Sequence, residues 1–337
     1  MTAQHAVGWS RRAFLGGLTL AGTAGLLGLR PGPVGAEPPP ETTQIRLIQF
    51  GSTCQAPLYL SDALLRTEGF TDVQWVRSDL VAVSKLLAAG NVDLGMNFVG
   101  PNLMGLEAGD PAIILAGGHV GCFELVGTDR VRSIRDLQGK AVAAPGHAEH
   151  VFLSAMAAHV GLDPRRDITW VRDTTADPVA LLTEGKIDAF MAFPPRTQEL
   201  RAKQIGHVVV NSALDRPWSQ YFCCMIIGHR EFIHQHPVAT KRALRAILKA
   251  ADLCALEPER AAHALVDKGF ATQYEYALRL MQDLPYGRWR DYNPEDTVRF
   301  YTLRLHEAVI IKSTPQKIIA QGTDWRFLNE LKKELKG

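Results

Sequence analysis

The sequence lacks most of the short motifs by which catalytic chains are recognised. It contains no GxxxxGK[ST] loop of a P-loop NTPase and no HExxH helix of a zinc protease. It also contains no GxSxG turn, which carries the nucleophile of α/β-hydrolases. It also holds no short-period repeat and no internal apolar run long enough to span a membrane. These absences weaken most enzyme interpretations without excluding them.

Cysteine is scarce, and its pattern is not that of a disulfide framework or a metal ribbon. The chain has five cysteines, an odd number, at Cys54, Cys122, Cys223, Cys224 and Cys254. None forms a CxxC pair, and adjacent residues of a strand point to opposite faces of a sheet. We expect these cysteines to be small buried apolar residues.

An excess of charge of either sign is missing as well. The chain has 337 residues, enough for about two domains, and 46% are hydrophobic. The first 36 residues hold three of the 37 basic residues and none of the 35 acidic ones, so the rest has 34 basic against 35 acidic residues, a charge of −1. This balance gives no electrostatic basis for binding nucleic acid.

The first 36 residues resemble a twin-arginine export signal. Arg11 and Arg12 precede an apolar segment at 13–29, and the small residues at 34–36 offer a cleavage site before Glu37. No cysteine lies near that point, which argues against a lipid anchor. An uncleaved membrane anchor and a disordered basic leader are the alternatives. We expect a periplasmic protein.

Beyond the Pro-rich linker, apolar runs alternate between strand and helix patterns. The expected strands are 45–50, 73–76, 92–98, 112–117 and 122–127, with helices at 57–70 and 82–90. The pattern then restarts with strands at 140–144, 168–171, 187–193 and 207–210 and helices at 150–162, 177–186 and 199–204. From 237 to 337 the pattern is helical. Such alternation predicts α/β architecture in two similar halves.

In this order, the segments resemble the solute-binding proteins of ABC importers for nitrate, sulfonates and taurine, a family that includes relatives of the thiamine-pyrimidine synthases. Most telling are LLAAGNVDLG and LLTEGKIDAF, in each of which a helix ends at Gly and an Asp precedes a strand. The matching stretches are 56–70, 86–103, 134–146, 160–171 and 181–195.

The resemblance implies a two-lobed type II periplasmic-binding-protein fold, each lobe a mixed β-sheet flanked by helices, joined by a two-strand hinge. Lobe 1 is expected at 42–126 plus 225–337, and lobe 2 at 127–224. The runs CFELVGT and YFCCMIIG would be the hinge strands, and a ligand would lie at the carboxyl ends of the other strands.

It also implies a function. The chain would be the extracytoplasmic solute-binding component of an ABC importer, a monomer that passes a small organic molecule to an inner-membrane permease with a separate ATPase. We expect no catalysis, metal or cofactor. One alternative is an enzyme related to pyrimidine synthases, with a lysine for pyridoxal phosphate and a cysteine cluster for iron. Another is a sensor subunit.

Candidate ligand-binding residues follow the expected strand ends of the first half. Ser52, Thr53 and Gln55 lie in the loop after the first strand, although Ser52 or Thr53 could instead cap a helix. The next such turn is expected at 97–102 and begins with Asn97 and Phe98, the latter either a stacking ring or a core residue.

Five further candidates follow along the chain, from the first half through the expected hinge to the second half. Gly100 would let the backbone approach a ligand, and His119 is a candidate ligand contact or a hydrogen-bonded structural residue. Phe193 ends a strand as an expected pocket wall. Trp218 and Tyr221 could contribute from the hinge side or form a half-buried structural pair.

The turn PGHAEHVF at 145–152 opens a helix whose N-terminus favours an anion. Many relatives have hydroxyl side chains here, whereas this chain has Gly146, His147 and Glu149. Glu149, expected at a solvent-facing helix start, caps the helix or complements its dipole. The alternative is that Glu149 or His147 reads a donor on a neutral or cationic ligand. His147 and His150 share a helix face, but with no third ligand they do not predict a metal site.

Overall fold

A computed structural model describes residues 37–78, 83–172 and 176–335 of the chain. The expected twin-arginine signal at 1–36 lies outside the described residues. Residues 1–38 and 39–337 form separate units, and the two sheets and the candidate site lie in the second. Within the described segments, no helix has the length and apolarity to cross a membrane.

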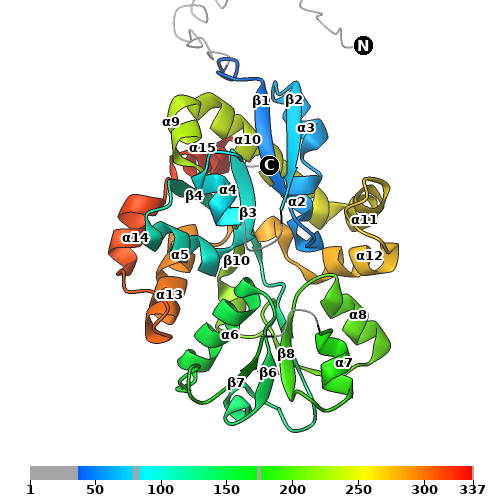
Figure 1. Cartoon of the computed structure of the whole chain (residues 1–337). Helices are drawn as coiled ribbons and strands as arrows, with labels where there is room; N and C mark the ends of the chain where they lie inside the picture. Colours follow the sequence, from blue (N-terminus) through cyan, green and yellow to red (C-terminus); the bar gives the residue numbers. More distant parts are fainter. Residues whose placement is uncertain (1–36, 79–82, 173–175, 336–337) are drawn as a thin grey trace, which may run out of the picture. The chain divides into compact units, whose positions relative to one another are not determined.

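Two five-stranded mixed sheets form the framework (Figure 1), with orders β2-β1-β3-β10-β4 and β7-β6-β8-β5-β9. The fourth strand of each sheet runs antiparallel to both neighbours. The strands are β1 (Gln44–Gln49), β2 (Asp72–Arg77), β3 (Leu94–Phe98), β4 (Ala112–Val120), β5 (Glu124–Gly127), β6 (Ala141–Ala143), β7 (Thr169–Val171), β8 (Ala189–Ala192), β9 (His207–Asn211) and β10 (Phe222–His229).

Helices connect the strands and make up the C-terminal region. Those up to β10 are η1 (Thr53–Gln55), α2 (Ala56–Tyr59), α3 (Asp62–Thr67), α4 (Val83–Ala88), α5 (Val99–Ala108), η2 (Ile134–Leu137), α6 (His147–His159), α7 (Pro178–Thr183), α8 (Arg196–Lys203) and η3 (Trp218–Gln220). Those after it are α9 (Arg230–Gln235), α10 (Pro237–Leu256), α11 (Pro258–Asp267), α12 (Tyr274–Asp283), η4 (Tyr286–Arg290), α13 (Pro294–Glu307), α14 (Pro315–Gly322) and α15 (Arg326–Glu334).

The chain crosses between the two sheets twice in the described region. It leaves β4 of the first sheet and enters β5 of the second through residues 121–123, and it returns from β9 to β10 through residues 212–221. Each crossing delivers the antiparallel fourth strand of the sheet that it enters. The expected two-sheet periplasmic-binding-protein architecture is confirmed, while the exact lobe boundaries stay a prediction.

The two aspartates singled out in the sequence have the same structural role in the two halves. Asp93 accepts a hydrogen bond from the backbone N–H of Arg46 at 2.7 Å, and Asp188 accepts one from the N–H of Ala141 at 3.0 Å. In return, the N–H of each aspartate donates to the carbonyl of the same partner residue. Each aspartate thereby fixes the start of its strand against a parallel neighbouring strand, β1 for Asp93 and β6 for Asp188.

Helix α5 differs from expectation. The sequence around Gly100 and Pro101 predicts a turn, but a helix begins at Val99 directly after β3. Pro101 lies in the first turn, where its missing N–H has no intrahelical partner to lose. The site residues at the end of β3 are therefore followed by a rigid helix.

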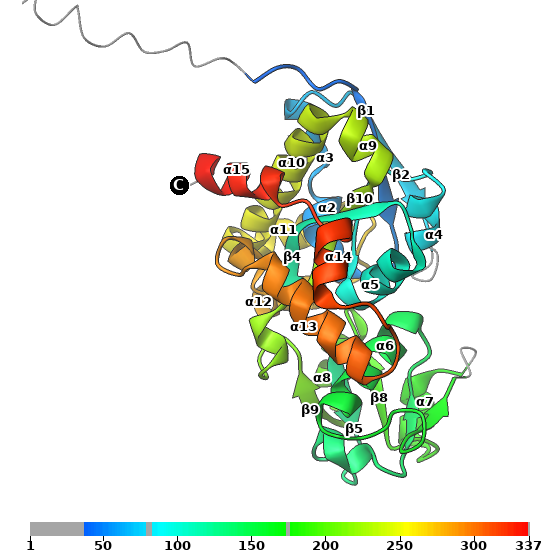
Figure 2. The same cartoon turned by 90° about the vertical axis from the view of Figure 1, so that its left-hand side faces the viewer.

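The C-terminal helices pack on both halves. Helix α10 packs against α2 and α3 beside the first sheet, and α13 contacts α5 as well as α6 of the second half (Figure 2). Helix α10 buries a continuous face of small and aliphatic residues, including Ala243, Leu244 and Ile247. The C-terminal region thus completes the first half and also contacts the second.

We expect Asp93→Ala to lower the free energy of unfolding by about 2–3 kcal/mol, because it removes a buried acceptor used by both the backbone and the side chain of Arg46. Urea denaturation measures this loss. Asp129→Ala, whose side chain is 90% exposed, is the control and should change stability by less than about 0.5 kcal/mol. Equal effects of the two substitutions would contradict the structural role of Asp93.

Candidate functional site

Two neighbouring cavities lie where strand ends of both sheets meet. The smaller has a volume of about 20 Å³ and the larger about 340 Å³, and Phe193 lines both. The loop after β1 and the first turn of α6 contribute to each. The smaller cavity admits one water-sized species, whereas the larger has the size of a small-molecule pocket.

The loop after β1 brings polar atoms to the smaller cavity. Ser52 makes no helix-capping hydrogen bond; its hydroxyl lies 3.0 Å from Cys54 Sγ and donates to the Pro194 carbonyl across the two halves at 3.4 Å. Gln55 is fully buried, and both polar atoms of its amide lack a hydrogen-bond partner within the described chain. Thr53 is buried but does not line either cavity.

The end of β3 supplies Asn97 and Phe98 to the same cavity. Asn97 Oδ1 accepts from the Phe98 N–H at 2.8 Å, so its side chain is held in place. Phe98 is only 2% exposed and packs on Phe152 and other rings, which makes it a core residue with one edge at the cavity. Gly100 lines neither cavity; a Cβ there would lie 2.7 Å from the Phe98 ring and 2.9 Å from Val151, so it serves helix packing.

The start of α6 differs from expectation, because Glu149 is not solvent-facing. Its side chain is 5% exposed and folds over Gly146, where an added Cβ would lie 2.1 Å from a carboxylate oxygen. Burial raises the pKa of Glu149 from 4.5 to about 7. Its Oε2 lacks a hydrogen-bond partner among the described residues, and Glu149 lines the larger cavity.

The two histidines of this turn do not converge. His147 is exposed and lines neither cavity. His150 Nε2 lies 2.6 Å from a guanidinium nitrogen of Arg172, and burial together with that charge lowers the pKa of His150 to about 4. The imidazole of His150 therefore contacts Arg172 and does not pair with His147.

The three aromatic candidates of the second half fall into two places. Phe193 is half-buried, lies at the junction of the cavities and meets the Phe123 ring edge-to-face at 5.8 Å. Trp218 is 2% exposed, and Tyr221 stacks on Phe300 at 3.9 Å. Neither Trp218 nor Tyr221 lines the cavities, so of the three only Phe193 lies where a solute could reach it.

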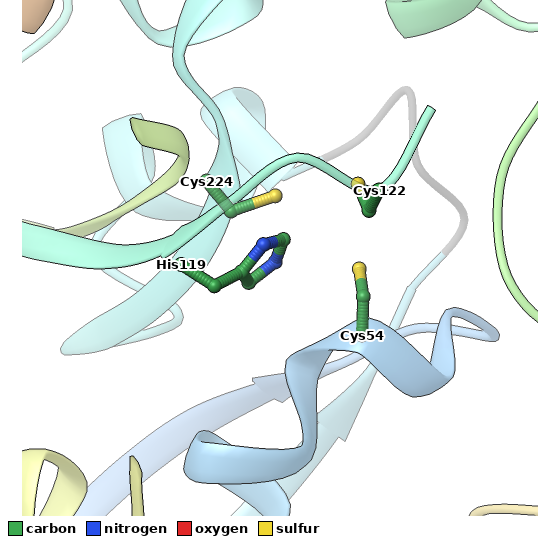
Figure 3. Close-up of side chains that lie close together, drawn as sticks. All are labelled: Cys54, His119, Cys122 and Cys224. Carbon is green, nitrogen blue, oxygen red and sulfur yellow. The ribbon is translucent and has the colours of Figure 1, made fainter. Parts of the chain in front are cut away.

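The sequence did not reveal one group of side chains. His119 is 1% exposed and faces Cys54, Cys122 and Cys224, and the ligand atoms of these four residues all lie within 4.8 Å of one another (Figure 3). All four are buried, as expected for the cysteines, but their proximity was missed because they are spread over 171 positions. One indication of their proximity was available in the sequence: each of the four residues lies in or beside a strand-end loop or an expected hinge strand.

A pyridoxal phosphate enzyme would need a lysine in this region. Among the described residues that line the two cavities, none is lysine. The residues present therefore do not fit covalent attachment of that cofactor at these cavities.

Solved structures with the same fold include two binding proteins. The periplasmic nitrate-binding protein NrtA from Synechocystis PCC 6803 matches with a TM-score of 0.72 at 16% identity, covering 89% of this chain and 90% of that chain. The alkanesulfonate-binding protein SsuA from Xanthomonas axonopodis pv. citri, bound to MOPS, matches with a TM-score of 0.66 at 18% identity, covering 86% of this chain and 100% of that chain.

Sequence comparison finds a different kind of relative. The 4-amino-5-hydroxymethyl-2-methylpyrimidine phosphate synthase THI12 of Saccharomyces cerevisiae is 25% identical over 255 residues, which are 69% of this chain and 72% of that protein. The family described as "NMT1/THI5 like" matches residues 71–261, more than half of the chain. The chain therefore belongs to the NMT1/THI5-like family.

Proposed function

We propose that this protein is the extracytoplasmic solute-binding component of an ABC importer. It would close on a small organic molecule between its two halves as a periplasmic monomer and deliver it to an inner-membrane permease with a separate ATPase. The nitrate- and sulfonate-binding proteins that share its fold support this function, as does the export-signal pattern of Arg11 and Arg12.

The observation that carries the proposal is the larger cavity. It takes Gly51 from the first half and Glu149 and Phe193 from the second, so a molecule held there would touch both. The two halves are connected by the crossings at 121–123 and 212–221. A solute that contacts both halves stabilises their closed arrangement by the free energy of those contacts, as hinge closure requires.

The charges of this cavity favour a solute that offers a hydrogen-bond donor. Arg196 lies 3.2 Å from Asp177 and 3.8 Å from Glu199, so its charge is already compensated. The buried Oε2 of Glu149 lacks a protein partner in the described chain, and a buried acceptor without a partner is costly. An amine, an amide or a donor-bearing heterocycle satisfies it better than nitrate or a simple sulfonate.

The identity to pyrimidine phosphate synthases favours a second candidate, an enzyme acting on related chemistry. The described residues that line the cavities include no lysine for pyridoxal phosphate, which counts against that candidate. A ligand resembling a pyrimidine would still agree with a receptor, because such rings carry donors.

A thermal-shift screen of the purified protein against nitrate, sulfonates, carboxylates, amines and pyrimidines tests the proposal. A solute at 100 times its dissociation constant adds about 2.7 kcal/mol of stability and raises the melting temperature by a few degrees. We expect the largest shifts from donor-bearing compounds. Turnover of a pyrimidine precursor, or a folded protein that no compound stabilises, would contradict the receptor function.

Phe193→Ala should weaken binding of a solute found in this way by about 1–3 kcal/mol, roughly 5- to 150-fold in dissociation constant, through loss of an aromatic wall. Isothermal titration calorimetry measures the change. Phe300→Ala is the matched control, since Phe300 is also half-buried but packs on Tyr221 away from the cavities. An unchanged affinity would assign Phe193 to packing alone.

Glu149→Gln should change the pH dependence of stability. The folded protein raises the pKa of Glu149 from 4.5 to about 7, so the parent loses stability as pH rises through this window while the variant does not. We expect the variant to gain up to about 3 kcal/mol relative to the parent above pH 7 and nothing near pH 4. Urea unfolding at several pH values measures it.

Exposed Glu184→Gln is the control for loss of a carboxylate from the same half. The Glu149→Gln variant should also bind donor-bearing solutes more weakly than the parent at neutral pH. A parallel pH profile in parent and variant, with equal affinities, would remove Glu149 from the site.

A further inference from the structure

Four buried side chains from distant parts of the chain converge beside the smaller cavity. Cys54 lies in η1, His119 near the end of β4, Cys122 in the first crossing and Cys224 in β10. In Figure 3 the three thiols and the imidazole ring approach one another from these separate elements. Three sulfurs and one imidazole are the donor set of a common tetrahedral zinc site.

The distances are close to those that such an ion needs. The four ligand atoms lie within 4.8 Å of one another. A tetrahedral Zn²⁺ with ordinary bonds to sulfur and nitrogen separates its ligand atoms by about 3.5–3.8 Å. The widest pair must therefore close by about 1 Å, which rotation of cysteine side chains can supply.

His119 needs a partner that the described chain does not give it. Both ring nitrogens are buried and have no hydrogen-bond partner within the described chain, and the ring meets Tyr286 edge-to-face at 5.6 Å. A buried polar group without a partner destabilises the fold. A metal bound through one nitrogen would remove much of that penalty.

The backbone of Cys122 has a strained conformation that directs its thiol toward the other three side chains. Its φ is +148°, a conformation that residues with a side chain rarely adopt, and holding it costs on the order of 1–3 kcal/mol. The N–H groups of Cys122 and Phe123 both donate to Ser212 Oγ, at 3.2 and 3.0 Å, which fixes this crossing against the other. Glycine would meet the backbone requirement without strain, so what cysteine adds is a sulfur aimed at the cluster.

Room for an ion is present at the same point. Cys54, Cys122 and Cys224 line the smaller cavity, whose volume of about 20 Å³ holds one water-sized species. The ion would lie next to the wall that Ser52 and Phe193 also form.

We propose that Cys54, His119, Cys122 and Cys224 bind a single thiophilic cation in tetrahedral geometry, with Zn²⁺ as the first candidate. Thiolate-rich sites of this kind select soft or borderline ions over Mg²⁺ and Ca²⁺. The ion would connect the first crossing to η1, β4 and β10 and form part of the cavity floor. This site does not depend on the solute-binding function proposed above.

Binding of Co²⁺ as a spectroscopic probe, followed by displacement with Zn²⁺, tests the site in the reduced, metal-free full chain. We expect one equivalent of Co²⁺ to give the intense visible bands and the near-ultraviolet thiolate charge-transfer bands of a tetrahedral thiolate site. Zn²⁺ should displace it and raise the melting temperature. A pale octahedral spectrum, or no binding, would overturn the proposal.

Cys122→Gly is the sharpest variant, because glycine accepts the backbone conformation of residue 122 while the sulfur is lost. We expect it to keep the metal-free fold and to weaken Co²⁺ binding at least about 100-fold with loss of the tetrahedral spectrum. Cys254→Ala is the control, since Cys254 is buried in α10 outside the cluster. Parent-like binding by Cys122→Gly would refute the assignment.

A second variant and a thiol analysis test the site independently of whether Cys122→Gly folds. His119→Asn removes the nitrogen ligand if Cys122→Gly fails to fold, and it should weaken binding to a similar degree. Cys223 Sγ lies 3.4 Å from Cys122 Sγ, so a disulfide between them would withdraw one ligand. Alkylation and mass spectrometry of the freshly isolated protein should find both thiols free or metal-protected; a Cys122–Cys223 disulfide there would overturn the proposal.

Discussion

The insertion of β10 between β3 and β4 is the interaction on which the rest of the structure depends. It pairs antiparallel with both neighbours, and residues 222–228 are all buried. Two glycines of β4 make room: a Cβ on Gly117 would lie 2.3 Å from the Phe222 ring, and one on Gly118 2.2 Å from Met96 Sδ. Because β10 begins where the chain returns from the second half, this pairing also fixes the second crossing and the position of Cys224.

Outside the crossings, the two halves are joined by buried aromatic packing as well as by polar side chains at the rim of their contact. Phe98 at the end of β3 and Tyr301 of α13 pack on the Phe152 ring of α6. Arg201 pairs with Asp283, and Arg304 lies 2.9 Å from His159 Nδ1. These residues are partly exposed, and exposed pairs of this kind contribute little individually. Opening of the two halves would break these polar contacts and part of the aromatic packing, while the crossings stay intact.

Much of the fold could be predicted from local pattern, because strands and helices of an α/β chain carry their periodicity in a few consecutive residues. The structure confirms the strand at 45–50 to within a residue as β1 and the helix of the PGHAEHVF turn as α6. Helix α5 was not predicted, because Gly100 and Pro101 suggest a turn. Packing against α6, α13 and α14, which a local pattern does not show, favours the helix there.

The site was less accessible to sequence reasoning, since its geometry depends on which residues tertiary structure brings together. In α/β sheets, ligands bind at the carboxyl ends of strands. This rule correctly placed four residues that lie at or just after strand ends beside the cavities: Ser52, Gln55, Asn97 and Phe193. No such rule joins Cys54 to Cys224. An amphipathic pattern also does not show that the Glu149 side chain folds inward over Gly146. This conformation is possible because Gly146 has no Cβ to occupy the same space.

Two buried carboxylates show how the surroundings decide what each can do. Burial raises the pKa of both Glu124 and Glu149 to about 7. Glu124 accepts from Asn211 Nδ2 at 3.0 Å and has Arg201 at 3.7 Å, so the protein itself supplies a donor and an opposite charge. No ion pair of Glu149 with a basic side chain is found in the described chain, and Glu149 lines the larger cavity while Glu124 does not. Of the two, Glu149 is the carboxylate that a solute in the larger cavity would contact, which is why we expect it, rather than a helix N-terminus alone, to set the chemistry of the solute.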